Sequence, residues 1–172
     1  MKNNKVQNRR QSLLIVSIVI IIFLAIAFFG AMLGSGSYGY AEQYKFDVTK
    51  KQLISTIENF KNKNQSFVPP VKYGSIDTLD TLTTKFFISI YFQNEDTIVD
   101  FFIDSSPNGT DESYINLVSV NQGLHSPVYK LINKDFDRNE NRNLKKEFEE
   151  RVLNKLNIPY EDKGNGNFIF WK

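Results

Sequence analysis

An apolar run from Leu13 to Leu33, LLIVSIVIIIFLAIAFFGAML, constrains this chain more than any other feature, because it contains no charged residue. A helix rises about 1.5 Å per residue and needs roughly 20 apolar residues to cross the hydrocarbon core of a bilayer. The run has 21 residues, so the sequence predicts one transmembrane helix over residues 13–33. It is longer than the roughly 7–15 apolar residues of a cleaved signal peptide, which favours an uncleaved signal-anchor. The small residues from Gly34 to Ala41 leave a cleaved signal peptide as the alternative.

The charges around this run predict its orientation. Four basic residues precede it: Lys2, Lys5, Arg9 and Arg10. The first acidic residue is Glu42, so the positive-inside rule places residues 1–12 in the cytoplasm as a basic stub. Residues 34–43, which are rich in glycine and serine, are then a flexible linker. Residues 44–172 form an extracytoplasmic domain, and the predicted location is the cell membrane of a bacterium.

The composition of the exported part excludes several kinds of protein. The whole chain has a formal charge of +2, but four of its 21 basic residues precede the apolar run, which leaves 17 against 19 acidic residues. No cluster of Lys and Arg follows, so a nucleic-acid partner is not expected. The absence of cysteine excludes disulfides and a cysteine-linked lipid anchor. The length after the linker suits one hydrophobic core.

Hydrophobic periodicity predicts an α+β fold for residues 44–172, with two or three helices on one side of an antiparallel sheet. The expected strands are a three-strand meander at residues 86–93, 97–104 and 114–121, and a C-terminal hairpin at residues 158–161 and 168–171. The expected helices run from a cap at Asp47 or Thr49 to about Asn62, over residues 128–136, and through Leu144, Phe148, Val152 and Leu156. These helices are not interleaved between successive strands, which points to an antiparallel α+β sandwich.

The two faces of the predicted meander differ in composition. One face is wholly apolar and is the expected core: Phe86, Ile88, Ile90, Phe92, Val99, Phe101 and Ile103. The other carries a smaller apolar set, Phe87, Tyr91, Ile98 and Phe102, edged by Gln93, Asp100 and Asp104. An apolar centre with a polar rim is typical of a partner-binding patch, so Tyr91 and Phe102 are predicted to be solvent-accessible. The alternative is that residues 71–84 or the terminal hairpin cover this face.

A G-x-x-x-G spacing joins Gly30 and Gly34 at the outer end of the apolar run. Two membrane helices can approach closely along such a ridge, so these glycines are candidates for a homodimer contact in the membrane. Small residues are also common in membrane helices that do not dimerise.

Residues Asp135 to Asn143 carry oxygen-bearing side chains at alternate positions, as a calcium loop does. The pattern breaks at Glu140, where a calcium loop needs glycine, and at Lys146, where it needs glutamate. The favoured interpretation is a helix start in which Asp137 and Glu140 form a capping box. No metal ligand set and no cofactor motif is predicted.

No catalytic residue is assigned. His125 is the only histidine, and the chain has no G-x-S-x-G motif. Asp100 and Asp104 are predicted to lie about 13 Å apart along one strand, which is too far for a pair of glycosidase carboxylates. The favoured function is a non-catalytic module of the cell envelope, anchored in the lipid bilayer, that binds another envelope protein. The alternatives are an immunity or inhibitor protein directed at a toxin and an envelope hydrolase built from the loops at 105–113 and 121–127.

Overall fold

The computed structural model describes residues 20–22, 38–71, 77–82, 84–122 and 128–165. The chain divides into two units, Met1–Tyr38 and Gly39–Lys172. In the first unit the description covers a helical stretch at residues 20–22 and Tyr38. The predictions for the stub at 1–12, for most of the run at 13–33, and for Gly30 and Gly34 therefore fall outside the described residues.

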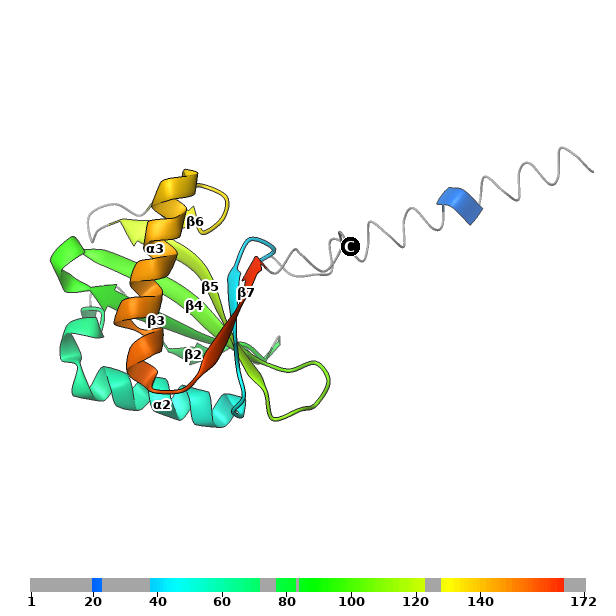
Figure 1. The fold of residues 1–172 in the computed structure, drawn as a ribbon, viewed down its shortest axis with the longest axis horizontal. Coiled ribbons are helices and arrows are strands. Elements are labelled where there is room, and N and C mark those ends of the chain that lie inside the picture. Colours follow the sequence, from blue (N-terminus) through cyan, green and yellow to red (C-terminus); the bar gives the residue numbers. More distant parts are fainter. Residues whose placement is uncertain (1–19, 23–37, 72–76, 83, 123–127, 166–172) are drawn as a thin grey trace, which may run out of the picture. The chain divides into compact units, whose positions relative to one another are not determined.

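The predicted fold requires a correction. Among the residues that the structure describes, no helix is long and apolar enough to cross a membrane. The folded unit is α+β, but its sheet is not a three-strand meander with a C-terminal hairpin. It is one antiparallel sheet of seven strands, with two α-helices and three short 3-10 helices in the described residues (Figure 1).

The sheet has the order β2-β3-β4-β5-β1-β7, and β6 also pairs with β5. Its strands are β1 (Glu42–Phe46), β2 (Thr78–Leu79), β3 (Phe86–Phe92), β4 (Thr97–Ser105), β5 (Ser113–Gln122), β6 (Tyr129–Leu131) and β7 (Tyr160–Asn165). The central part, β3 to β5, is the predicted meander. A bulge between Asp100 and Phe101 shifts the register of β4 against β5.

Outside the meander, the predicted strands were wrong. Residues 42–46, assigned to the linker and the domain start, form an inner strand, because β1 lies between β5 and β7. Alternation explains why this short segment is a strand, since Tyr44 and Phe46 point into the core and are fully buried. β7 pairs with β1, and residues 168–171 fall outside the described residues. Residues 129–131, expected to be helical, form β6.

Both α-helices begin at capping boxes. In α2 (Lys50–Lys63), the side chain of Thr49 accepts from the backbone of Gln52, whose side chain caps Thr49 in return. In α3 (Arg138–Arg151), Asp137 and Glu140 make the same reciprocal pair, which confirms the predicted capping box. The predicted helix through Leu156 is divided: α3 ends at Arg151, and η4 (Leu153–Leu156) follows as a 3-10 turn. The other two short helices are η1 (Gln65–Phe67) and η3 (Gln93–Glu95).

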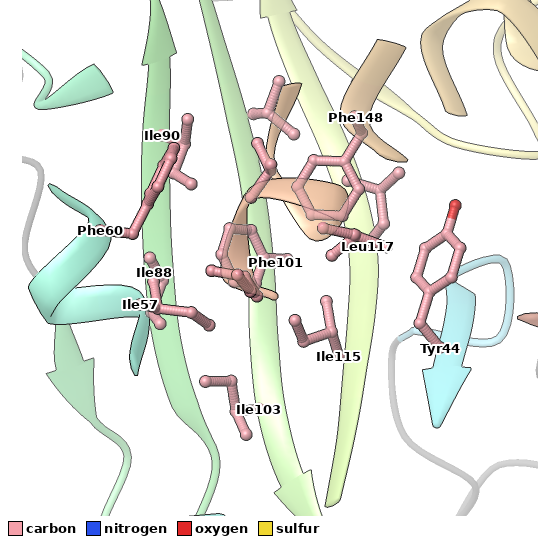
Figure 2. Packing of buried hydrophobic residues seen from close by; sticks show 14 of the residues in the cluster. Tyr44, Ile57, Phe60, Ile88, Ile90, Phe101, Ile103, Ile115, Leu117 and Phe148 are labelled. Carbon is pink, nitrogen blue, oxygen red and sulfur yellow. The ribbon is translucent and has the colours of Figure 1, made fainter. Parts of the chain in front are cut away.

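One hydrophobic core joins the helices to what we call the first face of the sheet, which is the face predicted to be apolar (Figure 2). Phe101 and Ile115 come from the sheet, Ile57 from α2 and Phe148 from α3, and all four side chains are almost fully buried. The assignment of this face to the core is therefore confirmed, although Phe86 at its margin is only half-buried. The opposite side, which we call the second face, carries the candidate site.

Candidate functional site on the second face of the sheet

The four residues predicted to bind a partner lie together on the second face. Phe87 is directly opposite Phe102, and Tyr91 is directly opposite Ile98, across the β3–β4 pairing. Their exposure differs from the prediction, because Tyr91 is 8% exposed, Ile98 6% and Phe102 4%. Only Phe87 is half-buried. The prediction that Tyr91 and Phe102 are solvent-accessible is therefore wrong.

Neighbouring side chains account for part of this burial. The Phe102 ring lies 5.6 Å from the Phe87 ring, centroid to centroid, and the Lys85 ammonium lies 4.6 Å from the Phe102 centroid. The Tyr91 hydroxyl donates a 2.8 Å hydrogen bond to Asp96, at the turn before β4. Alternation assigns a residue to a face, but it does not reveal how far neighbours on that face cover it.

A polar row crosses the centre of the second face between these aromatic residues. Ser89, Asp100 and Ser119 are directly opposite one another on β3, β4 and β5. The Asp100 carboxylate accepts hydrogen bonds from the Ser89 hydroxyl at 2.6 Å and the Ser119 hydroxyl at 3.3 Å. None of the ion pairs found in the described residues includes Asp100. Burial raises the pKa of the Asp100 carboxyl, and the two hydroxyl bonds lower it by less.

The raised pKa of Asp100 predicts a pH dependence of stability. A carboxyl whose pKa is higher in the folded state than its unfolded value of about 3.9 binds its proton more tightly when folded. Wild-type stability should therefore fall, relative to Asp100→Asn, as the pH rises from about 4 through the folded pKa. Urea unfolding of both proteins between about pH 3 and pH 7 measures this difference. A difference that stays constant or grows with pH contradicts the assignment.

A polar atom without a hydrogen-bond partner lies next to this row. Asn121 is directly opposite Ile98 and two residues beyond Ser119, so it lies on the same face. Asn121 is 7% exposed, and its amide oxygen is fully buried without a hydrogen-bond partner. Most buried polar groups in proteins are hydrogen-bonded, so such an atom requires an explanation.

A cleft of about 410 Å³ opens at the other end of the second face. Its lining residues come from β1, β4 and β5, from the residue before β3 and from the loop after β4: Gln43, Lys85, Phe102, Asp104, Ser105, Pro107, Tyr114 and Asn116. Gln43 and Asn116 are paired across β1 and β5, and the side-chain amide nitrogen of Gln43 donates a 3.1 Å hydrogen bond to the side-chain amide oxygen of Asn116. The lining of the cleft thus contains aromatic rings, side-chain amides, one basic residue and one acidic residue.

Charged groups gather around the end of this cleft. The Lys50 ammonium donates to the carbonyl of Thr84, just before Lys85. Burial lowers the pKa of Lys50, and the nearby Asp104 carboxylate raises it by less.

The chemistry available here is recognition by hydrogen bonds, charge and aromatic contact. Within the described ranges, no three His, Cys, Asp or Glu side chains lie close enough together to hold a metal ion. Asp100 and Asp104 share a face, as predicted. His125 falls outside the described residues, so the structure does not place it.

Sequence analysis missed half of the residues that line the cleft. Ser105 and Pro107 belong to a loop considered for a hydrolase, but Gln43, Lys85, Tyr114 and Asn116 had no role in any prediction. Tyr114 and Asn116 follow the alternation of β5 and could have been found from it once the inward face of that strand was known. Gln43 could not, because it reaches the cleft only through the pairing of β1 with β5.

Comparison with known proteins gives no match: no family model, no curated protein and no solved structure resembles the chain significantly.

Proposed function

We propose that this protein is a non-catalytic protein-binding module and that the cleft on the second face is its binding site. The observation that carries the proposal is the combination of an aromatic lining, from Phe102 and Tyr114, with Lys85 and Asp104 in one hollow. Protein interfaces typically have a buried anchor surrounded by polar groups.

The size of the cleft supports an anchor side chain as its occupant. Pockets that bind small molecules have volumes of about 300–1,000 Å³, and this cleft, at about 410 Å³, lies near the lower end. One large side chain of a partner fits such a space. The half-buried ring of Tyr114 would contact that side chain, while the amides of Gln43 and Asn116 offer further hydrogen bonds.

Photocrosslinking in the native host tests this proposal. p-Benzoylphenylalanine in place of Tyr114, a half-buried residue of the cleft, should give a discrete adduct with one protein. The matched control replaces Tyr129, which is 63% exposed and pairs with Asn121 at the far end of β5. No adduct at position 114, or the same adducts at both positions, contradicts the cleft as the binding site. A secreted toxin in the adduct would favour the inhibitor alternative over an envelope partner.

We also propose, from the sequence, that the chain is attached to the cell membrane through the apolar residues 13–33 and that the folded unit lies outside the cytoplasm. The support is the length of the uncharged run and the four basic residues before it. Protease added to intact spheroplasts should degrade the folded unit, and alkaline carbonate should leave the chain with the membranes. Protection from protease contradicts the orientation, and release by carbonate contradicts the attachment.

A further inference from the structure

The chain leaves the sheet beside the cleft. The last two residues of β7, Gly164 and Asn165, are directly opposite Gln43 and Glu42 of β1, and Gln43 belongs to the cleft lining. Residues 166–172 follow β7 in the sequence and lie outside the described residues. This segment therefore starts on the strand next to one that supplies a wall of the cleft.

One cross-strand row connects the end of β7 with the cleft on the second face. Gly164 pairs with Gln43, Gln43 with Asn116, and Asn116 with Phe102. A methyl group placed on Gly164 would meet no atom of the described residues within 4 Å. Gly164 also has a φ of +72° and lies at a bulge, where a strand bends. The start of the row is thus open to the chain that follows it.

The segment 166–172 is long enough to reach the cleft. Trp171 is six residues beyond Asn165, so an extended chain spans up to about 20 Å between them. The cleft lies over β5 and β4, which are two and three strands away from β7. At the usual spacing of about 4.8 Å between strands, this is a distance of about 10–14 Å. A chain that crosses the second face therefore brings Trp171 to the cleft.

The composition of the segment matches the lining of the cleft. Four large apolar residues, Phe168, Ile169, Phe170 and Trp171, are followed by Lys172. Burial of one such apolar side chain contributes about 1.5–3 kcal/mol, so a run of four favours a covered position. The indole of tryptophan also carries one N–H donor, and the lysine ammonium carries a positive charge.

The cleft offers a partner for each of these groups. The half-buried ring of Tyr114 provides an aromatic contact. The side-chain oxygens of Gln43 and Asn116 can accept a hydrogen bond from an indole N–H. Asp104 is half-buried and takes part in none of the ion pairs among the described residues. Its carboxylate is thus available to a lysine.

We infer that the segment 166–172 folds back over the second face and places Trp171 in the cleft, with Lys172 beside Asp104. The cleft is then occupied by the chain itself, at an effective concentration of about millimolar for so short a connection. A partner protein must displace Trp171 before its own side chain enters. The inference rests on the proposed function only for this competition, and the docking of Trp171 does not depend on it.

Two other occupants explain less of the arrangement. A bilayer surface would bury the same apolar side chains, but it makes no use of the Asp104 carboxylate or of the amides in the cleft. A second copy of the chain could receive the segment in its own cleft, but the row from Gly164 already leads to the cleft of the same chain. Docking within one chain also avoids the loss of translational freedom that association costs.

Fluorescence of Trp171, which is the only tryptophan of the chain, tests the inference on the full-length protein in detergent. Acrylamide should quench Trp171 weakly in the wild-type protein. Ser105→Phe places a ring in the cleft lining, at an exposed residue, and should raise the quenching constant at least twofold. The matched control, Ser55→Phe, changes an exposed serine of α2 and should leave it unchanged. An unchanged urea midpoint shows that each variant is folded.

The same fluorescence identifies the other occupants. Equal acrylamide quenching of the wild-type protein and Ser105→Phe would overturn the inference. Strong quenching by a detergent with brominated chains would place Trp171 in the micelle and would also overturn it, as would shielding that disappears on dilution, which indicates a second copy. Should Ser105→Phe not fold, p-benzoylphenylalanine at position 171 decides: it should attach to the peptide that contains Tyr114 in the same chain. A shielded Trp171 without any partner adduct at position 114 would reject the proposed function alone.

Discussion

Phe148→Ala should lower the free energy of unfolding by about 3–5 kcal/mol, the usual cost of removing a buried phenylalanine side chain. Phe148 is 1% exposed and is the fully buried residue of α3. Its ring lies 5.4 Å from that of Phe101 and 6.0 Å from that of Tyr44, centroid to centroid. Because Phe101 belongs to β4 and Tyr44 to β1, the substitution removes ring contacts between α3 and two strands.

Urea denaturation of the full-length protein measures this loss as a fall in midpoint at unchanged slope. The control is Tyr129→Ala, an exposed aromatic residue of β6, for which a change within about 0.5 kcal/mol is expected. If Phe148→Ala loses no more than this control, α3 does not pack on the sheet as described.

Phe102→Ala should lose stability on a similar scale, about 3–5 kcal/mol, although Phe102 lies on the second face. An open patch predicts the opposite, because replacements at exposed positions usually change stability by less than about 0.5 kcal/mol. The structure favours the large loss, since the Phe87 ring and the Lys85 ammonium both lie against the Phe102 ring.

Phe87→Ala is the matched control for Phe102→Ala. The two residues are cross-strand partners of the same type, but Phe87 is half-buried, so its substitution should cost clearly less. Equal and small losses of unfolding free energy at both positions would show that the second face is open in solution. Phe102 would then be an exposed residue and not a covered one.

Local signals in the sequence predicted the two capped helices and the central strands well. Thr49 and Asp137 cap helices because their side chains bond within three residues along the chain, so the necessary information lies in a short window. The alternation of β3 and β4 likewise identified the core face before its partner helices were known. Helix ends were less predictable: α3 stops at Arg151, although the apolar spacing continues to Leu156.

Long-range pairing could not be predicted in the same way. β1 is a strand because β5 and β7 flank it, and both lie far along the chain. Five residues with only two large apolar side chains, Tyr44 and Phe46, carry too little periodicity to identify an inner strand. Because β1 was not recognised, the predicted sheet had too few strands, and the residues at the start of β7 were assigned to a C-terminal hairpin.

The same limit explains the partial success at the site. The prediction placed Phe87, Tyr91, Ile98 and Phe102 on one face correctly, because a strand alternates regardless of its neighbours. It misjudged their exposure, because exposure depends on the rings and charges that surround them. The unpaired amide oxygen of Asn121 has no sequence signal at all, since only the hydrogen-bond partners in the fold distinguish it from any other asparagine.

The most direct test of the central claim is to fill the cleft and measure the affinity for the protein that crosslinks at position 114. Ser105→Trp places a large side chain in the cleft lining, at an exposed residue, and should weaken binding at least tenfold. The matched control, Ser55→Trp, changes another exposed serine, in α2, and should leave the dissociation constant within about twofold of wild type. Equal dissociation constants for both variants and the wild-type protein would contradict the cleft on the second face as the binding site.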